Sequence, residues 1–129
     1  MLDEMRQRGT PKVVSTWASH LPTWLEVIAP TTVDTSLRLD VGETDAIGLA
    51  RELKADLLLL DERKASAVAR QLGLQVTGTL SVLSLAAEKL LLELPAAIKA
   101  LRQTNFRGPV EIMEEMLKQD ELRRTGRKP

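Results

Sequence analysis

Asp56-Leu57-Leu58-Leu59-Leu60-Asp61 is the stretch that decides the fold class. Four consecutive leucines bounded by acids, without polar alternation, are typical of a strand buried on both faces, as in a parallel sheet. A predicted helix follows, with apolar residues on one face and Gly73 after its end. Leu74-Gln75-Val76 then forms a short strand. Strand, helix and strand in so short a segment predict a βαβ unit and an α/β fold.

The rest of the chain is predicted from the same kinds of signal. A helix follows Gly42, because the apolar residues after it recur at helical spacing. Thr79 is a plausible N-cap for another helix, extending to about Leu92. Two further helices begin near Pro95 and at Val110. Helical fragments at 2–8 and 13–20 and a short strand at 24–28 precede them. We predict one domain over residues 1–122 and a basic tail over 123–129.

Composition limits the function. The chain has 129 residues, and the absence of cysteine excludes disulfides, thiolate metal sites and a cysteine nucleophile. Neither a secretory leader nor an apolar run long enough to cross a bilayer is recognisable, so a cytoplasmic protein without a membrane partner is predicted. Basic and acidic residues balance at 18 each, and aromatic residues make up 2%. Stable coating of nucleic acid is therefore not expected. A brief, metal-mediated contact fits better.

Two carboxylates are predicted to share one edge of the sheet. Asp61 ends the leucine strand, and ligands of open parallel sheets bind beyond the carboxyl ends of the strands. Glu43 lies in the first turn of the preceding helix, which should run antiparallel to that strand. Neighbouring carboxylates repel, and a hard divalent ion relieves the repulsion. The pair therefore suggests metal-assisted hydrolysis. The alternatives are structural: Asp61 as the N-cap of the next helix, and Glu43 as an acid favoured by the helix dipole.

A family resemblance rests on three connected strings, at residues 39–50, 55–65 and 69–79. Together they resemble the second half of a PIN-domain protein, nearest to an uncharacterised, toxin-like (VapC-type) prokaryotic branch. The match is tight over 39–85 and looser over the C-terminal helices. It implies a three-layer α/β/α sandwich with a short central parallel sheet.

The resemblance also implies an activity. PIN-type proteins cleave RNA at a Mg²⁺ or Mn²⁺ site of three or four acids, often as the toxin of a toxin–antitoxin pair. Glu43 matches the acid that opens the central helix, and Asp61 matches the acid at the strand end. Glu4 resembles an earlier family glutamate. Glu62 stands where the branch often has a second aspartate. RNA is the expected substrate, and an antitoxin protein is a possible partner.

The front of the chain departs from the family pattern. A first strand carrying a metal-binding aspartate is expected there, and we predict an N-terminally truncated fold whose open sheet edge is covered by a homodimer or another partner. The alternative function is a non-catalytic remnant that acts as a binding or dimerisation module.

Several other side chains have both a functional and a structural interpretation. Arg63 and Lys64 either contact phosphate or lie on a solvated helix face. Thr77 and Thr79 either contact metal or phosphate, or serve as a helix cap. The tryptophans are expected to pack on the sheet or, if its edge is open, to form a protein interface. They are Trp17 and Trp24.

Overall fold

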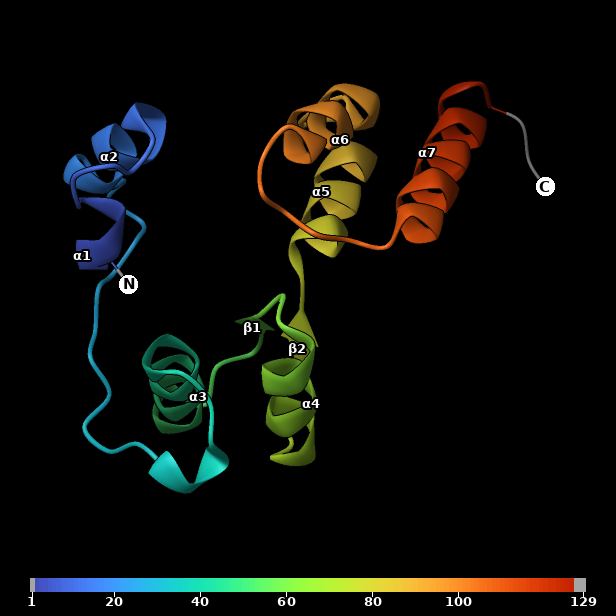
Figure 1. Cartoon of the computed structure of the whole chain (residues 1–129). Coiled ribbons are helices and arrows are strands. Elements are labelled where there is room, and N and C mark those ends of the chain that lie inside the picture. The colour runs from blue at the N-terminus through green and yellow to red at the C-terminus, as the bar shows by residue number, and fades with distance from the viewer. Residues whose placement is uncertain (1, 127–129) are drawn as a thin grey trace.

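The computed structural model describes residues 2–126, which contain seven α-helices and a two-stranded parallel sheet (Figure 1). In chain order the elements are α1 (Leu2–Met5), α2 (Lys12–Ser19), the 3-10 helix η1 (Thr35–Leu37), α3 (Val41–Leu53), β1 (Leu58–Leu59), α4 (Arg63–Gln71), β2 (Val76–Thr77), α5 (Thr79–Glu88), α6 (Leu94–Arg102) and α7 (Val110–Arg124). None of the described helices is long and apolar enough to cross a membrane.

The predicted βαβ unit is present. Strands β1 and β2 run parallel, with Leu58 opposite Val76 and Leu59 opposite Thr77, and α4 connects them. The α/β class is therefore confirmed. The leucine run is not buried on both faces, however, because Leu57 is 57% exposed and Leu59 is 56% exposed. That prediction was wrong because α3 and α4 pack against the strands without enclosing the second face.

Local signals set the ends of the helices. Gly73 follows the end of α4 at a φ of 84°, a conformation that glycine adopts without strain. Helix α5 stops at Glu88, earlier than predicted, and Leu90 lies in the left-handed region with a φ of 60°. The residue that caps α5 is Gly78, so the prediction of Thr79 as N-cap was wrong.

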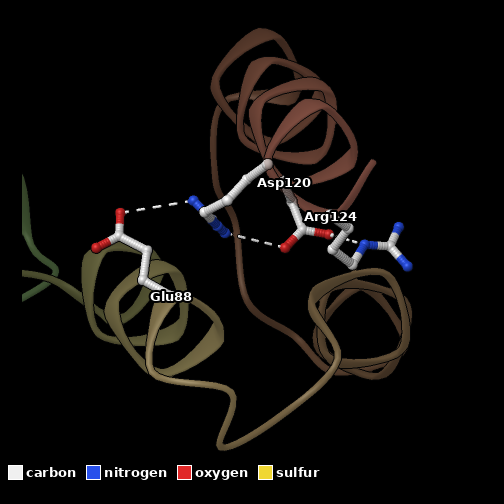
Figure 2. Close-up of polar contacts among 4 residues, drawn as sticks. Glu88, Asp120 and Arg124 are labelled. Carbon is white, nitrogen blue, oxygen red and sulfur yellow. Dashed lines mark hydrogen bonds and ion pairs between the residues drawn. The ribbon is translucent and has the colours of Figure 1, made fainter. Parts of the chain in front are cut away.

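The main apolar core lies between the last three helices. Ala87 of α5, Leu94 and Ile98 of α6, and Met113 of α7 form one buried cluster, and these helices contact one another pairwise. At its margin, Asp120 is buried in α7 and pairs with Arg123 at 3.0 Å and with Arg124 at 2.9 Å. Arg123 also approaches Glu88 at 3.6 Å, so this network joins α7 to α5 (Figure 2).

The first two helices pack against each other. The guanidinium of Arg6 donates to the backbone carbonyl of Ala18 at 2.9 and 2.7 Å, and Ala18 is fully buried. A long irregular segment then leads to α3 (Figure 1). The predicted strand at 24–28 is not formed, since the described residues offer it no partner strand. Trp24 is 77% exposed, so the prediction that it packs on the sheet was also wrong.

The segment after residue 28 is fixed to α3. One carboxylate oxygen of Glu52 accepts hydrogen bonds from the Thr31 amide and hydroxyl, both at 2.7 Å, and from the Thr32 amide at 2.9 Å. The Thr32 carbonyl would lie only 3.0 Å from a Cβ added at Gly48. A small residue in α3 therefore lets this loop approach the helix closely.

Candidate functional site

Asp61 connects the end of the strand to the start of α5. Its Oδ1 accepts the backbone N–H of Thr79 at 2.7 Å, and its Oδ2 accepts the Thr79 hydroxyl. Thr79 is the first residue of α5, where backbone amides lack partners within the helix and favour a negative charge. The alternative that Asp61 caps the helix directly after it was wrong, because that N-cap is Glu62.

Gly78 makes this connection possible. A Cβ at this position would lie 2.8 Å from Oδ1 of Asp61 and 3.6 Å from the Leu60 carbonyl. The φ of Gly78 is −119°, so the need for glycine comes from close approach and not from an unusual torsion. The Leu60 amide also donates to the Thr77 carbonyl at 2.9 Å. The ends of both strands and the start of α5 are thus held together.

Glu43 takes part in a capping box at the start of α3. Oδ1 of Asp40 accepts the Glu43 amide at 2.8 Å, and Oε2 of Glu43 lies 3.4 Å from the Asp40 amide. The two side chains therefore satisfy two backbone donors at this helix end. Glu43 thus has a structural role, and the capping hydrogen bond uses only one oxygen of its carboxylate.

Glu62 shows that the starts of α3 and α4 are neighbours. Oε2 of Glu62 accepts the Ala65 amide at 2.7 Å, and this hydrogen bond is the main reason that the pKa of Glu62 lies below its ordinary value. The negative charge of Asp40 has a smaller, opposing effect on the same pKa. Such an effect requires the Asp40 carboxylate to be close by. The starts of α3 and α4 therefore lie near each other, and the convergence of Glu43 with Asp61 stays a prediction.

The basic residues of α4 differ in what they contact. Nζ of Lys64 donates to the Arg38 carbonyl at 3.1 Å, which fixes the loop before α3 against α4. Arg38 itself adopts a left-handed conformation with a φ of 57°. Arg63, in the first turn of α4, is exposed. Lys64 thus has a structural contact, whereas Arg63 lies on an open surface at the same edge.

Glu4 lies on another part of the molecule. Its helix α1 packs against α2, and Glu4 itself is exposed (Figure 1). The structure therefore places Asp40 and Glu62, at the starts of α3 and α4, near each other, and Glu4 lies on a helix that packs elsewhere. Over residues 2–126, no group of three or more His, Cys, Asp or Glu side chains is arranged to hold a metal ion.

The side chains at this edge still suit a hard divalent cation. Carboxylate oxygens are the ligands that Mg²⁺ prefers, and Mg²⁺ commonly takes one or two of them and keeps several waters. The hydrogen bonds to Glu43 and Glu62 use only Oε2 of each. A carboxylate oxygen has two lone pairs, so Asp61 can accept from Thr79 and still coordinate a cation. The donor set therefore fits a two-carboxylate site.

One residue at this edge, Asp40, and one contact, between Thr79 and Asp61, were not predicted from the sequence. Asp40 could have been found, since Asp40-Val41-Gly42-Glu43 has the spacing of a capping box before an apolar helix. The Thr79 contact with Asp61 has no comparable local signal, because 18 residues separate the two.

Comparison with known families gives one match. A family model described as a PIN domain matches residues 1–121, which is nearly the whole chain. No curated protein matches the chain, and no solved structure does.

Proposed function

Because this chain belongs to the PIN-domain family, we propose that it is a ribonuclease dependent on a divalent metal, with its site where α3, α4 and α5 begin. PIN domains are generally nucleases that bind RNA and use divalent metals, so a nuclease-type, hydrolytic function follows from the family. The observation that supports this site is the hydrogen bond from the first amide of α5 to Asp61. Asp61 thereby lies beside Glu62, and Asp40 at the start of α3 lies near Glu62.

Each residue at the edge has a proposed role. Asp61 and Glu43 are the metal ligands, with Mg²⁺ or Mn²⁺ as the ion. Thr79 orients Asp61 by donating to both of its oxygens. Arg63 is exposed at the start of α4 and contacts substrate phosphate as a bidentate donor. When bound, the cation supplies Lewis acidity at a phosphoryl oxygen.

Finer parts of the proposal rest on the resemblance alone. These are a three-layer sandwich as the complete fold, a role as the toxin of a toxin–antitoxin pair, and an antitoxin protein as partner. Lys64 and Thr77 are further substrate contacts on the same grounds. Glu4 remains a proposed third ligand, although its helix packs against α2.

The test is Mn²⁺-dependent cleavage of a mixed single-stranded RNA pool by the full chain and by two charge-removing variants. Asp61→Asn keeps an oxygen for the Thr79 amide. Glu43→Gln keeps the capping box, which accepts glutamine as readily as glutamate. Both variants therefore remove a ligand charge and keep the backbone hydrogen bonds, and in Asp61→Asn the side-chain amide can donate to the Thr79 hydroxyl in place of accepting from it. Glu114→Gln, at an exposed acid of α7, is the matched control.

We expect each site variant to lower Mn²⁺ affinity and cleavage at least about 10- to 100-fold, the range typical of residues that only support a metal ligand. The control should cleave like the unmodified chain. If all four proteins are inactive and none binds Mn²⁺ by calorimetry, catalysis is excluded for this chain. The alternative of a non-catalytic PIN module that binds a protein partner would then replace it.

A further inference from the structure

A pocket of about 580 Å³ lies between α3 and the segment that contains η1, and it has no role in the proposed metal site. Pockets that hold small organic ligands have volumes of roughly 300–1,000 Å³. The apolar side chains that line this pocket are Val33, Leu37 and Ile47, and Ile47 is buried. The pocket is thus large enough for one flat ring system and offers apolar side chains for the ring to contact.

The pocket extends along α3 from a point close to the proposed metal edge. Thr44, which directly follows Glu43 in α3, lines the pocket and is buried. Arg51 and Glu52, in the last turns of the same helix, also line it. Arg51 lies about 12 Å beyond Glu43 along the helix axis, at a rise of about 1.5 Å per residue. A ligand of the pocket is therefore a near neighbour of a phosphate bound at that edge.

The charged side chains that line the pocket have hydrogen-bonding capacity to spare. Oδ1 of Asp34 accepts from the amide and hydroxyl of Ser36, and Oε1 of Glu52 accepts the three hydrogen bonds from the loop before η1. The other oxygen of each carboxylate, Oδ2 and Oε2, accepts no hydrogen bond from the described residues. No ion pair of the described residues involves Arg51. The pocket therefore offers two carboxylate acceptors and one guanidinium donor.

The charges of the lining favour a neutral ligand. Hydrogen bonds from Ser36 lower the pKa of Asp34, and the nearby positive charge of Arg51 adds to this effect. The pKa of Glu52 is also lowered, chiefly by the Thr32 amide, so both carboxylates are ionised near neutral pH. Two carboxylates and one guanidinium give the lining a formal charge of −1. Such a pocket repels phosphate, and the guanidinium disfavours a cation. A neutral molecule with both donors and acceptors fits best.

We propose that this pocket binds a guanine base, either in the substrate RNA or in a free nucleotide. Guanine alone among the four RNA bases has two adjacent donors, N1–H and N2–H₂, beside two adjacent acceptors, O6 and N7. The free oxygens of Asp34 and Glu52 accept hydrogen bonds from the donors. Arg51 donates to O6 and N7, which is the commonest specific contact between an arginine and a base. The apolar side chains of the pocket contact the ring.

For RNA, the inference rests on the proposed nuclease function and adds a base preference to it. A base of a single strand can be turned away from its neighbours and read in a pocket, while its phosphate stays outside. The pocket reaches from Thr44 to Glu52, and Thr44 directly follows the proposed metal ligand Glu43. The guanine in the pocket thus belongs to a nucleotide near the scissile phosphate, and cleavage occurs preferentially close to guanine.

The test titrates the metal-free full chain with nucleosides and locates binding by amide NMR spectra. Guanosine, adenosine, cytidine and uridine are compared, and 7-deazaguanosine, which lacks N7, measures the contact with Arg51. Arg51→Met removes the guanidinium and keeps a straight side chain of similar helix propensity. Arg70→Met, at an exposed arginine of α4 outside the pocket, is the matched control. The same spectra show whether each variant is folded. A second arm compares a short oligouridine with the same RNA carrying one central guanosine.

We expect guanosine to shift the amide signals of Asp34, Thr44, Arg51 and Glu52. The other three nucleosides should bind about 10- to 100-fold more weakly, the discrimination of one bidentate base contact. Loss of N7 should weaken binding to the unmodified chain and to Arg70→Met, and it should make no difference in Arg51→Met.

No guanosine binding, equal binding of all four nucleosides, or shifts confined to other residues overturn the proposal. So does a folded Arg51→Met chain that binds guanosine as tightly as the unmodified chain. Both results of the RNA arm are informative once guanosine binds: tighter binding of the guanosine-containing RNA identifies RNA as the ligand, and equal binding of the two RNAs identifies a free guanine nucleotide. Since no metal is present and no RNA is cleaved, failure here is distinct from failure of the proposed nuclease activity.

Discussion

Asp61 and Gly78 show how single residues build this site. The carboxylate of Asp61 reaches the first amide of α5 only because the residue before that amide has no side chain. Hydrogen bonds between charged and neutral groups are stronger than those between two neutral groups. This contact therefore fixes the carboxylate in place before any ligand arrives.

We predict that Gly78→Ala destabilises the protein by about 1–3 kcal/mol, the usual cost of forcing an extra methyl group into occupied space. The new Cβ would lie 2.8 Å from Asp61 Oδ1, so the carboxylate must leave the Thr79 amide. Gly42→Ala is the matched control in α3, where the nearest atom would be 3.6 Å from the added Cβ. It should stabilise the helix by about 0.5–1 kcal/mol. Urea unfolding of both variants checks the contrast, and equal effects would contradict it.

At the scale of elements, Glu52 joins the loop that follows residues 24–28 to α3. The hydrogen bond from the Thr32 amide is the main reason that the pKa of Glu52 lies below its ordinary value of 4.5, and the Thr31 hydroxyl adds to this. A carboxyl whose pKa is lowered by folding stabilises the native state while it is ionised. That stabilisation is present above pH 4.5 and is lost as the pH falls through the lowered pKa.

We therefore predict that Glu52→Gln is less stable than the unmodified chain near neutral pH and that the difference shrinks in acid. Below the lowered pKa, the carboxyl of the unmodified chain is protonated and resembles the neutral amide. Urea midpoints measured at about pH 6.5 and at about pH 3 test this. Between those pH values the native and unfolded states bind different numbers of protons, so the contribution of Glu52 to stability changes. An equal difference at both values would show that Glu52 acts through packing.

At the scale of the whole molecule, the buried apolar cluster lies in α5–α7, and α3, β1, α4 and β2 form a separate group of contacts. Strand β2 leads directly into α5, and the Asp61–Thr79 hydrogen bonds connect the two parts. Regions with different buried contacts can open separately. The C-terminal helices should therefore respond to core mutations more strongly than the sheet region does.

We predict that Ile98→Ala destabilises α5–α7 by about 2–5 kcal/mol and that Ile98→Val costs about 0.5–1.5 kcal/mol, because a larger cavity costs more. Ile98 is 2% exposed, so little of the lost contact can be replaced by water. Native-state hydrogen exchange should show lost protection over 79–124 and retained protection over 41–77. A uniform loss over both ranges would show that the two parts unfold as one unit.

Much of the fold was predictable because local chemistry specifies it. The βαβ unit, the helix starting near Gly42 and the chain reversal at Gly73 depend on side-chain spacing and backbone torsion, which neighbouring residues largely fix. That Glu43 and Asp61 share one edge of the sheet stays a prediction, which rests on the antiparallel path of a helix and the next strand. The family could also be recognised from the combined sequence motifs between residues 39 and 79.

The sequence by itself determined which residues favour helix, strand or turn, and which acids stand at the ends of those elements. Only the tertiary structure decided which faces of these elements are buried and which residues they contact. The four leucines at 57–60 look like core residues, yet Leu57 and Leu59 face solvent because no element covers that side. Asp61 finds its partner 18 residues away, and the segment 24–28 pairs with no strand of the described residues. Burial and strand pairing depend on segments that are distant in the sequence and come together only on folding. A local sequence pattern therefore does not reveal them.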